Sequence, residues 1–191
     1  MSAVYRLRHR RTGVTVAGKR IQKGSEVHRS GDYLNEVQML QKLSAAPYIV
    51  SLHGVCEDDA DFWTIMELCP GGRLEVWLRQ FPHTARKAVL QLLEASMKHE
   101  HGKLVCHLDI KPDNVLLSGA GEVRLCDFVT ACQLQDAEQQ LVGRCGTESF
   151  RAPEVCRAYS GLKADVFSLG RTLQVVEEDN WPQQTSPYQP S

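Results

Sequence analysis

Apolar and polar residues alternate in the first third of the chain, and this two-residue period predicts β-strands. The predicted strands are 4–7, 14–21, 48–55 and 62–68. Between the two pairs the period lengthens, because Leu34, Val37, Leu40 and Leu43 recur every three or four residues. This spacing predicts a helix over 33–43, which Pro47 would end.

The pattern changes after the Pro-Gly-Gly break at 70–72. Helical periods dominate beyond it, and the predicted helices are 73–81, 85–101 and 165–176. The longest of them carries Val89, Leu92, Leu93 and Met97 on one face. Short strands are expected at 115–117 and 123–125, on either side of a turn. A strand-rich front and a helix-rich rear are therefore expected.

Charge and composition narrow the classes of function. The 191 residues carry 22 Lys and Arg against 23 Asp and Glu, so the formal net charge is −1. This balance gives no basic footprint for nucleic acid or an anionic membrane, so neither partner is expected. No stretch approaches the roughly 18 apolar residues of a membrane helix. The basic start, 1–13, lacks the apolar core of a secretory signal, although a weak targeting arm stays open.

The seven cysteines are scattered and contain no C-x-x-C pair. Without a secretory signal, free thiols in a reducing compartment are expected, which favours a cytoplasmic location and leaves the nucleus open. The cysteines also lack the ligand spacing of a structural zinc site.

Six segments carry charged and polar residues in a characteristic order. They are VTVAGK with Lys19, the first helix with Glu36, HLDIKPDN with Asp109, Lys111 and Asn114, CDF with Asp127, GTESFRAPEV with Thr147 and Glu154, and KADVFSLG with Asp165. Taken singly, Lys19 would be a surface lysine, Asn114 a turn residue and Asp127 a capping carboxylate. Six motifs in this order make coincidence negligible.

This order and spacing resemble the eukaryotic protein kinase family over about residues 2–170. The resemblance implies an α+β, two-lobed kinase-like fold that is incomplete. Its expected parts are a strand-rich N-lobe at 1–69 and a partial helical C-lobe at 70–178. The stretch 179–191, rich in Pro, Gln and Ser, predicts a disordered tail. It also implies transfer of the ATP γ-phosphate to a Ser or Thr hydroxyl of a protein substrate. The K-P-x-N form and Thr147 resemble the serine/threonine branch, and HLDIKP also occurs in calmodulin-dependent-type kinases.

The resemblance assigns the phosphoryl-transfer chemistry to a few side chains. Lys19 would clamp the α- and β-phosphates of ATP, held in place by Glu36. Asp109 would orient the acceptor hydroxyl or take its proton, and Lys111 would neutralise charge on the moving phosphoryl group. Thr147 would bridge Asp109 and Lys111 through its hydroxyl.

The family also implies Mg²⁺, with Asn114 and Asp127 supplying hard oxygen ligands. Asp165 would brace the backbone before the catalytic loop as a structural residue. An apolar adenine pocket is expected as well. Its members by resemblance are the roof residues Val4 and Ala17, the floor residue Leu116, the gatekeeper Met66, and the hinge residues Glu67 and Cys69.

Four departures from the family pattern affect these expectations. The glycine-rich loop is missing, since its third glycine would align with Ser2. Val129 replaces the glycine of D-F-G and is expected to stiffen that loop. Leu108 replaces the arginine of H-R-D, so a phosphate on the activation loop would lack its usual cation. The rear lobe stops early, which would leave a buried Glu154 without an arginine partner.

These departures keep two other readings open. The chain could be a pseudokinase that serves as a binding or scaffold module. It could also be an inactive kinase fragment that does not fold alone. The oligomeric state and the protein substrate cannot be read from the sequence.

Overall fold

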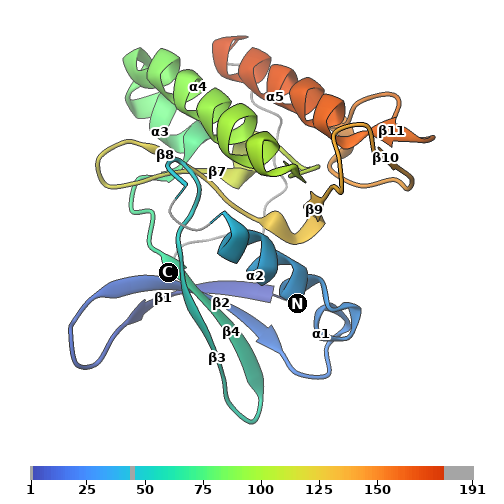
Figure 1. Ribbon diagram of the computed structural model, residues 1–191. Helices are drawn as coiled ribbons and strands as arrows, with labels where there is room; N and C mark the ends of the chain where they lie inside the picture. Colours follow the sequence, from blue (N-terminus) through green and yellow to red (C-terminus); the bar gives the residue numbers. More distant parts are fainter. Residues whose placement is uncertain (1, 44–45, 179–191) are drawn as a thin grey trace.

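The computed structural model describes residues 2–43 and 46–178, and its first part is built on a four-stranded antiparallel sheet (Figure 1). The strands are β1 (Ser2–Arg8), β2 (Thr15–Gln22), β3 (Leu52–Glu57) and β4 (Asp61–Glu67). They lie in the order β1-β2-β4-β3, so β2 and β4 form the centre. The four strands that alternation predicts are therefore present, although β3 begins at Leu52 rather than at residue 48.

Two helices follow β2, of which the sequence predicts only the second. The short α1 (Glu26–Ser30) ends at Gly31, whose φ of 77° is a left-handed conformation that suits glycine. The chain then turns into α2 (Asp32–Lys42). Tyr33 takes the inward position and lies 4.5 Å from the Phe62 ring, centroid to centroid, on β4. Leu34 is 48% exposed as a result, so its expected place on the buried face is wrong.

The second part holds α3 (Leu74–Gln80), α4 (Ala85–Leu93) and α5 (Gly161–Glu178). These helices lie together at the top of Figure 1, and α2 lies between them and the sheet. The helix expected over 85–101 leaves α-helical geometry after Leu93 and becomes π-helical over Glu94–Glu100. The wider π turns shift the later residues around the axis, so Met97 is 45% exposed instead of buried.

Short strands connect the helices and carry the loops between them. They are β5 (Gly72–Arg73), β6 (Val105–Cys106), β7 (Val115–Leu117), β8 (Val123–Leu125), β9 (Cys132–Gln133), β10 (Gln140–Leu141) and β11 (Tyr159–Ser160). They form a three-stranded sheet in the order β5-β7-β8 and the pairs β6-β9 and β10-β11. Each of the motif loops is thus tied down by a strand next to it.

One hydrophobic cluster runs through both parts of the chain. Its fully buried members include Leu40 from α2 and Leu125 and Phe128 from the segment after β7. Backbone hydrogen bonds join the parts at the same place, because Val50 N donates to Leu125 O at 2.9 Å and Leu125 N donates to Tyr48 O at 2.8 Å. The two parts therefore share one core and one stretch of backbone pairing.

Two expectations about the end of the chain have different outcomes. The disordered tail expected at 179–191 lies outside the described residues. Glu154 is exposed rather than buried, so it carries no desolvation cost of the kind expected for an unpaired buried carboxylate.

Within 2–43 and 46–178, no helix has both the length and the apolar character needed to span a bilayer.

Asp165 on α5 is fully buried and holds the backbone that precedes the HLDIKPDN loop. Its carboxylate accepts hydrogen bonds from His107 N at 2.8 Å and from Leu108 N at 2.7 Å. Leu108 has a φ of 64°, a conformation that costs a non-glycine residue energy and that these bonds stabilise. The bracing position expected for Asp165 is therefore the one it occupies.

Replacing Asp165 with alanine removes the acceptor of two amides, at a cost of about 1–3 kcal/mol for each. We therefore expect Asp165→Ala to shift the midpoint of urea unfolding strongly downward. Lys163→Ala, which alters an exposed residue of the same helix, is the matched control and should leave the midpoint unchanged. An Asp165→Ala midpoint equal to that of the control would contradict the bracing role.

Candidate active site

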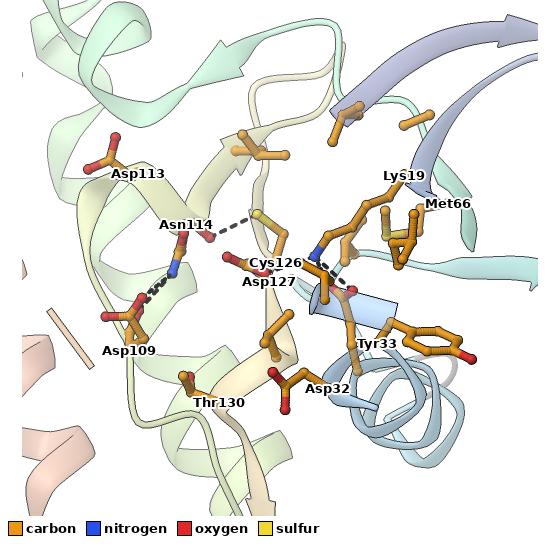
Figure 2. A pocket seen from close by; sticks show the side chains of 18 of the residues that line it. Lys19, Asp32, Tyr33, Met66, Asp109, Asp113, Asn114, Cys126, Asp127 and Thr130 are labelled. Atoms are coloured by element: carbon orange, nitrogen blue, oxygen red, sulfur yellow. Dashed lines mark hydrogen bonds and ion pairs between the residues drawn. The ribbon is translucent and has the colours of Figure 1, made fainter. Parts of the chain in front are cut away.

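A cavity of about 690 Å³ lies between the sheet and the second part of the chain. Figure 2 shows polar side chains converging on it from β2, from α2 and from the loops around β7 and β8. Of the predicted charged and polar residues, Lys19, Glu36, Glu67, Asp109, Asn114 and Asp127 line it. Residues that are up to 108 positions apart in the sequence thus meet at one cavity.

Lys19 is the centre of an ion cluster in this cavity. Its Nζ lies 2.8 Å from Glu36 Oε2 and 3.0 Å from Asp127 Oδ1 (Figure 2). The Lys19 and Glu36 side chains are 12% and 1% exposed, whereas Asp127 is 44% exposed. Burial lowers the pKa of Lys19, but the charges of Glu36 and Asp127 outweigh it, so the net shift is upward. Lys19 is therefore a permanent cation at the cavity wall.

Three different elements bring this cluster together. Lys19 lies on the central strand β2, opposite Thr64 of β4. Glu36 belongs to the buried face of α2. Asp127 follows β8 with a φ of 64°, so the chain turns there before the 3₁₀ turn that begins at Phe128. The cluster therefore depends on the packing of α2 between the sheet and β8.

The loop that follows Asp127 is held inward. Phe128 is fully buried and its ring centroid lies 4.6 Å from that of His107. Asn35 on α2 donates from Nδ2 to Val129 O at 3.1 Å and to Ala131 O at 2.7 Å. Sequence reasoning missed the role of Asn35 in holding this loop, because no sequence pattern distinguishes Asn35 from a surface residue of α2.

Asp109 forms a second cluster with Lys111, Thr147 and Asn114. The Asp109 carboxylate accepts from Thr147 N at 2.7 Å and lies 2.8 Å from Lys111 Nζ. Lys111 Nζ also donates to Thr147 Oγ1 at 2.6 Å. Burial raises the pKa of Asp109, but the hydrogen bonds from Lys111 and Thr147 outweigh it and hold the pKa below its usual value. Asp109 is therefore ionised at neutral pH.

Gly146 makes this arrangement possible. It has a φ of 75°, and a Cβ at this position would lie 2.3 Å from the carbonyl oxygen of Leu108. Only glycine allows the backbone before Thr147 to approach the Asp109 loop this closely. Lys111 and Thr147 do not line the cavity. They contact Asp109, which does line it.

The donor set beside Asp109 suits a hard cation. Asn114 donates through Nδ2 to Asp109 O at 2.9 Å and to Asp109 Oδ2 at 3.2 Å, and Asp127 presents a partly exposed carboxylate. Among the described residues, no group of three or more His, Cys, Asp or Glu side chains forms a metal site by itself. Mg²⁺ is usually bound by one or two carboxylates with water and substrate phosphates completing its shell, so these residues fit it.

The apolar end of the cavity is lined by Val4, Ala17, Met66 and Leu116. Cys69 is not among the lining residues, and its carbonyl accepts from Gly72 N at 3.1 Å, so its place in the adenine pocket stays a prediction.

The Glu67 carboxylate at this end is already engaged. Its Oε1 accepts from Ser51 N at 2.9 Å and lies 2.9 Å from Arg124 Nε. Glu67 therefore lines the cavity with its carboxylate already bound to Ser51 and Arg124.

Sequence reasoning also missed charged residues at the cavity. Asp32 and the ion pair of Arg73 with Asp113, 3.1 Å between Nη1 and Oδ1, line it as well. Asp113 lies within the HLDIKPDN motif and could have been suspected, whereas Asp32 and Arg73 had no sequence signal.

Comparison with known proteins gives one family. The family described as "Protein kinase domain" matches residues 1–188. The chain is 36% identical over 171 residues to "Serine/threonine-protein kinase PEPKR2" of Arabidopsis thaliana, covering 87% of this chain and 35% of that protein. It is 36% identical over 193 residues to "CBL-interacting protein kinase 4" of Oryza sativa subsp. japonica, covering 94% and 42%. It is 39% identical over 178 residues to "Sperm motility kinase 2B" of Mus musculus, covering 90% and 36%.

The chain thus spans well under half the length of these curated relatives. The match over nearly all of its own length confirms the fold that the order of motifs predicts, a strand-rich part followed by a helical part.

The buried pair of Lys19 and Glu36 should be coupled in stability. Lys19→Met leaves a carboxylate at 1% exposure without its cation, at an expected cost of about 3–5 kcal/mol. Adding Glu36→Leu removes that carboxylate and should restore most of the lost free energy of unfolding. Urea denaturation of the four proteins of this double-mutant cycle measures the coupling. Additive effects of the two substitutions would show that the pair is not coupled.

Proposed function

Because the chain belongs to the protein kinase domain family, we propose that it transfers the γ-phosphoryl group of ATP to a serine or threonine hydroxyl of a protein. One observation carries the proposal. Lys19 and Asp109 line the same cavity, so a cation and an ionised carboxylate face one space. We assign residues 1–69 to the N-lobe and 70–178 to the C-lobe that enclose it.

Binding of the adenine base of ATP is assigned to the apolar end of the cavity. Val4, Ala17, Met66 and Leu116 offer an apolar lining for a flat base. Lys19 then lies where it can bind the phosphates, and its ion pairs with Glu36 and Asp127 fix the ammonium in place. The raised pKa of Lys19 keeps its charge available for the phosphates at physiological pH.

The acceptor hydroxyl is assigned to Asp109. Its carboxylate is ionised and held from two sides by Thr147 and Lys111, so it can orient a hydroxyl in line with the γ-phosphate and accept its proton. Lys111, whose Nζ lies 2.8 Å from Asp109 Oδ2, is assigned the neutralisation of charge that develops on the transferred group. The pairing of Lys111 with the Thr147 hydroxyl supports a serine/threonine rather than a tyrosine substrate.

Mg²⁺ would be held by Asn114 and Asp127. When bound, the ion neutralises charge on the β- and γ-phosphates. Asp127 also accepts a hydrogen bond from the Lys19 ammonium at 3.0 Å, so this carboxylate would serve both Lys19 and the metal ion. ATP, Mg²⁺ and free thiols together favour a cytoplasmic setting for the reaction.

Asp109→Asn tests the reaction itself. The variant keeps the size of the side chain but loses the negative charge, so phosphate incorporation into a mixed protein substrate should fall by about 100-fold or more. Stabilisation of the fold by Mg²⁺ and ATP should persist, because Lys19 and the apolar lining are unchanged.

The matched control is Asp136→Asn, at an exposed site away from the cavity, which should retain full activity. Phosphate incorporation that is equally low in the unaltered chain and in Asp109→Asn would favour a pseudokinase or scaffold. Nucleotide stabilisation without turnover would identify that alternative, and no cooperative unfolding at all would identify a non-folding fragment.

Activity should not require phosphorylation of the loop after Asp127. Leu108 supplies no cation for a phosphate, and it packs in an apolar cluster with Ala152, Val155 and Tyr159. The Thr130 hydroxyl is engaged as a donor to His107 O at 3.0 Å. Phosphatase treatment is expected to leave the initial rate unchanged, and a complete loss of activity would contradict this.

A further inference from the structure

Two cysteines outside the nucleotide cavity face each other across a two-stranded sheet. In the antiparallel pair of β6 and β9, Cys106 lies directly opposite Cys132. Directly opposed residues in such a pair have Cα atoms about 4.5–5.5 Å apart. A disulfide joins Cα atoms about 4.4–6.8 Å apart, so the register already meets its main requirement.

The two side chains are also in contact. A hydrogen bond between the side chains of Cys106 and Cys132 lowers the pKa of Cys132, and it outweighs both burial and the charge of Asp165. Cys132 is partly exposed, whereas Cys106 is fully buried. Oxidants attack thiols that can be reached from solvent and whose pKa is lowered, and Cys132 has both features beside its cross-strand partner.

The cysteines that line or adjoin the cavity have the opposite character. Burial raises the pKa of Cys69 to about 12, and burial also raises the pKa of Cys126. Both are therefore poor nucleophiles at neutral pH. Compared with these two cysteines, Cys132 beside Cys106 on the β6–β9 pair is therefore the one expected to react with an oxidant.

The surroundings of the pair restrict where Cys106 can turn. A Cβ at Gly161, at the start of α5, would lie 2.7 Å from Cys106 Sγ, so α5 closes one side of the thiol. Nearby, Cys145 Sγ and the Tyr159 hydroxyl are 3.1 Å apart and hydrogen-bonded to each other. Cys145 is thus engaged with Tyr159, which leaves Cys132 as the natural partner of Cys106.

The position of the pair connects it to the active site. Cys106 is followed directly by His107 and, three residues along, by Asp109. Cys132 comes five residues after Asp127. A covalent bond here would join the start of the Asp109 loop to the end of the Asp127 loop.

We propose that Cys106 and Cys132 are a modification site, where a reversible disulfide forms and slows phosphoryl transfer. A peroxide is the oxidant. The Cys132 thiolate attacks one peroxide oxygen and becomes a sulfenic acid, releasing the other oxygen as water after protonation. The Cys106 sulfur then attacks the Cys132 sulfur, the S–S bond forms, and a second water leaves. The two thiols lose two protons and two electrons in total, and these reduce one hydrogen peroxide to two waters.

The bond draws the two sulfurs from hydrogen-bond contact to a covalent distance of about 2.05 Å. The backbone of β6 and β9 must adjust, and the contacts of Asp109 with Thr147 and Lys111 at 2.7 and 2.8 Å depend on the segment that β6 leads into. Misplacement of a positioned group slows a reaction strongly. The effect on rate rests on the function proposed above, whereas formation of the bond does not.

The test treats the folded chain with hydrogen peroxide and maps its cysteine peptides by mass spectrometry without reduction. We expect a Cys106–Cys132 linked peptide that disappears on treatment with dithiothreitol. Phosphate incorporation should fall severalfold on oxidation and return on reduction. Cys132→Ser and Cys106→Ala should each abolish the linked peptide and the reversible loss of activity. Cys56→Ser, at an exposed cysteine of β3, is the matched control and should behave like the unaltered chain.

Two results would overturn the proposal. In the first, the peroxide-treated chain yields no Cys106–Cys132 linked peptide although circular dichroism shows that it is folded. The other is a linked peptide that forms while phosphate incorporation stays the same in oxidised and reduced protein. If the reduced chain has no kinase activity, the proposed function fails, and with it the effect on rate. The peptide map then still decides whether the bond forms, so the two failures are distinguishable.

Discussion

The ion cluster of Lys19, Glu36 and Asp127 joins the four-stranded sheet to the second part of the chain. Two of its members are almost completely buried, so each needs the other to remain charged in the core. The three residues come from β2, from α2 and from the segment after β8. Their contacts at 2.8 and 3.0 Å therefore fix the distance between the sheet and the second part of the chain, and the cavity is the space that this distance leaves.

A second constraint acts from the other side of the cavity. Asp165 holds the amides of His107 and Leu108, and Gly146 lets the Thr147 backbone approach the same loop. Asp109 is thus held through the backbone of His107 and Leu108 by α5 and directly by Thr147, while Lys19 is held by Glu36 of α2. The arrangement is preorganised in the sense that catalysis requires, because the charged groups are held before any substrate binds.

Much of this could be predicted from the sequence, since strand alternation, helical spacing and motif order are local signals. Val37 and Leu40 marked the buried face of α2, but Leu34 did not belong to it, because Tyr33 fills the inward position. Met97 was wrongly predicted to be buried, because the helix changes to π turns after Leu93 and the spacing of apolar residues does not show that change. The facing of Cys106 and Cys132 could not be predicted at all, because the register of β6 and β9 is set by tertiary packing.

We infer that the Lys19 cluster belongs to a nucleotide site that also accepts Mg²⁺. Isothermal titration calorimetry of ATP into the chain, with and without Mg²⁺, measures this binding. We expect saturable binding of one ATP per chain that is strengthened by Mg²⁺ and greatly weakened in Lys19→Met, with folding of that variant verified in the same buffer. Absence of ATP binding by the folded chain, or binding that ignores both Mg²⁺ and the loss of Lys19, would contradict it.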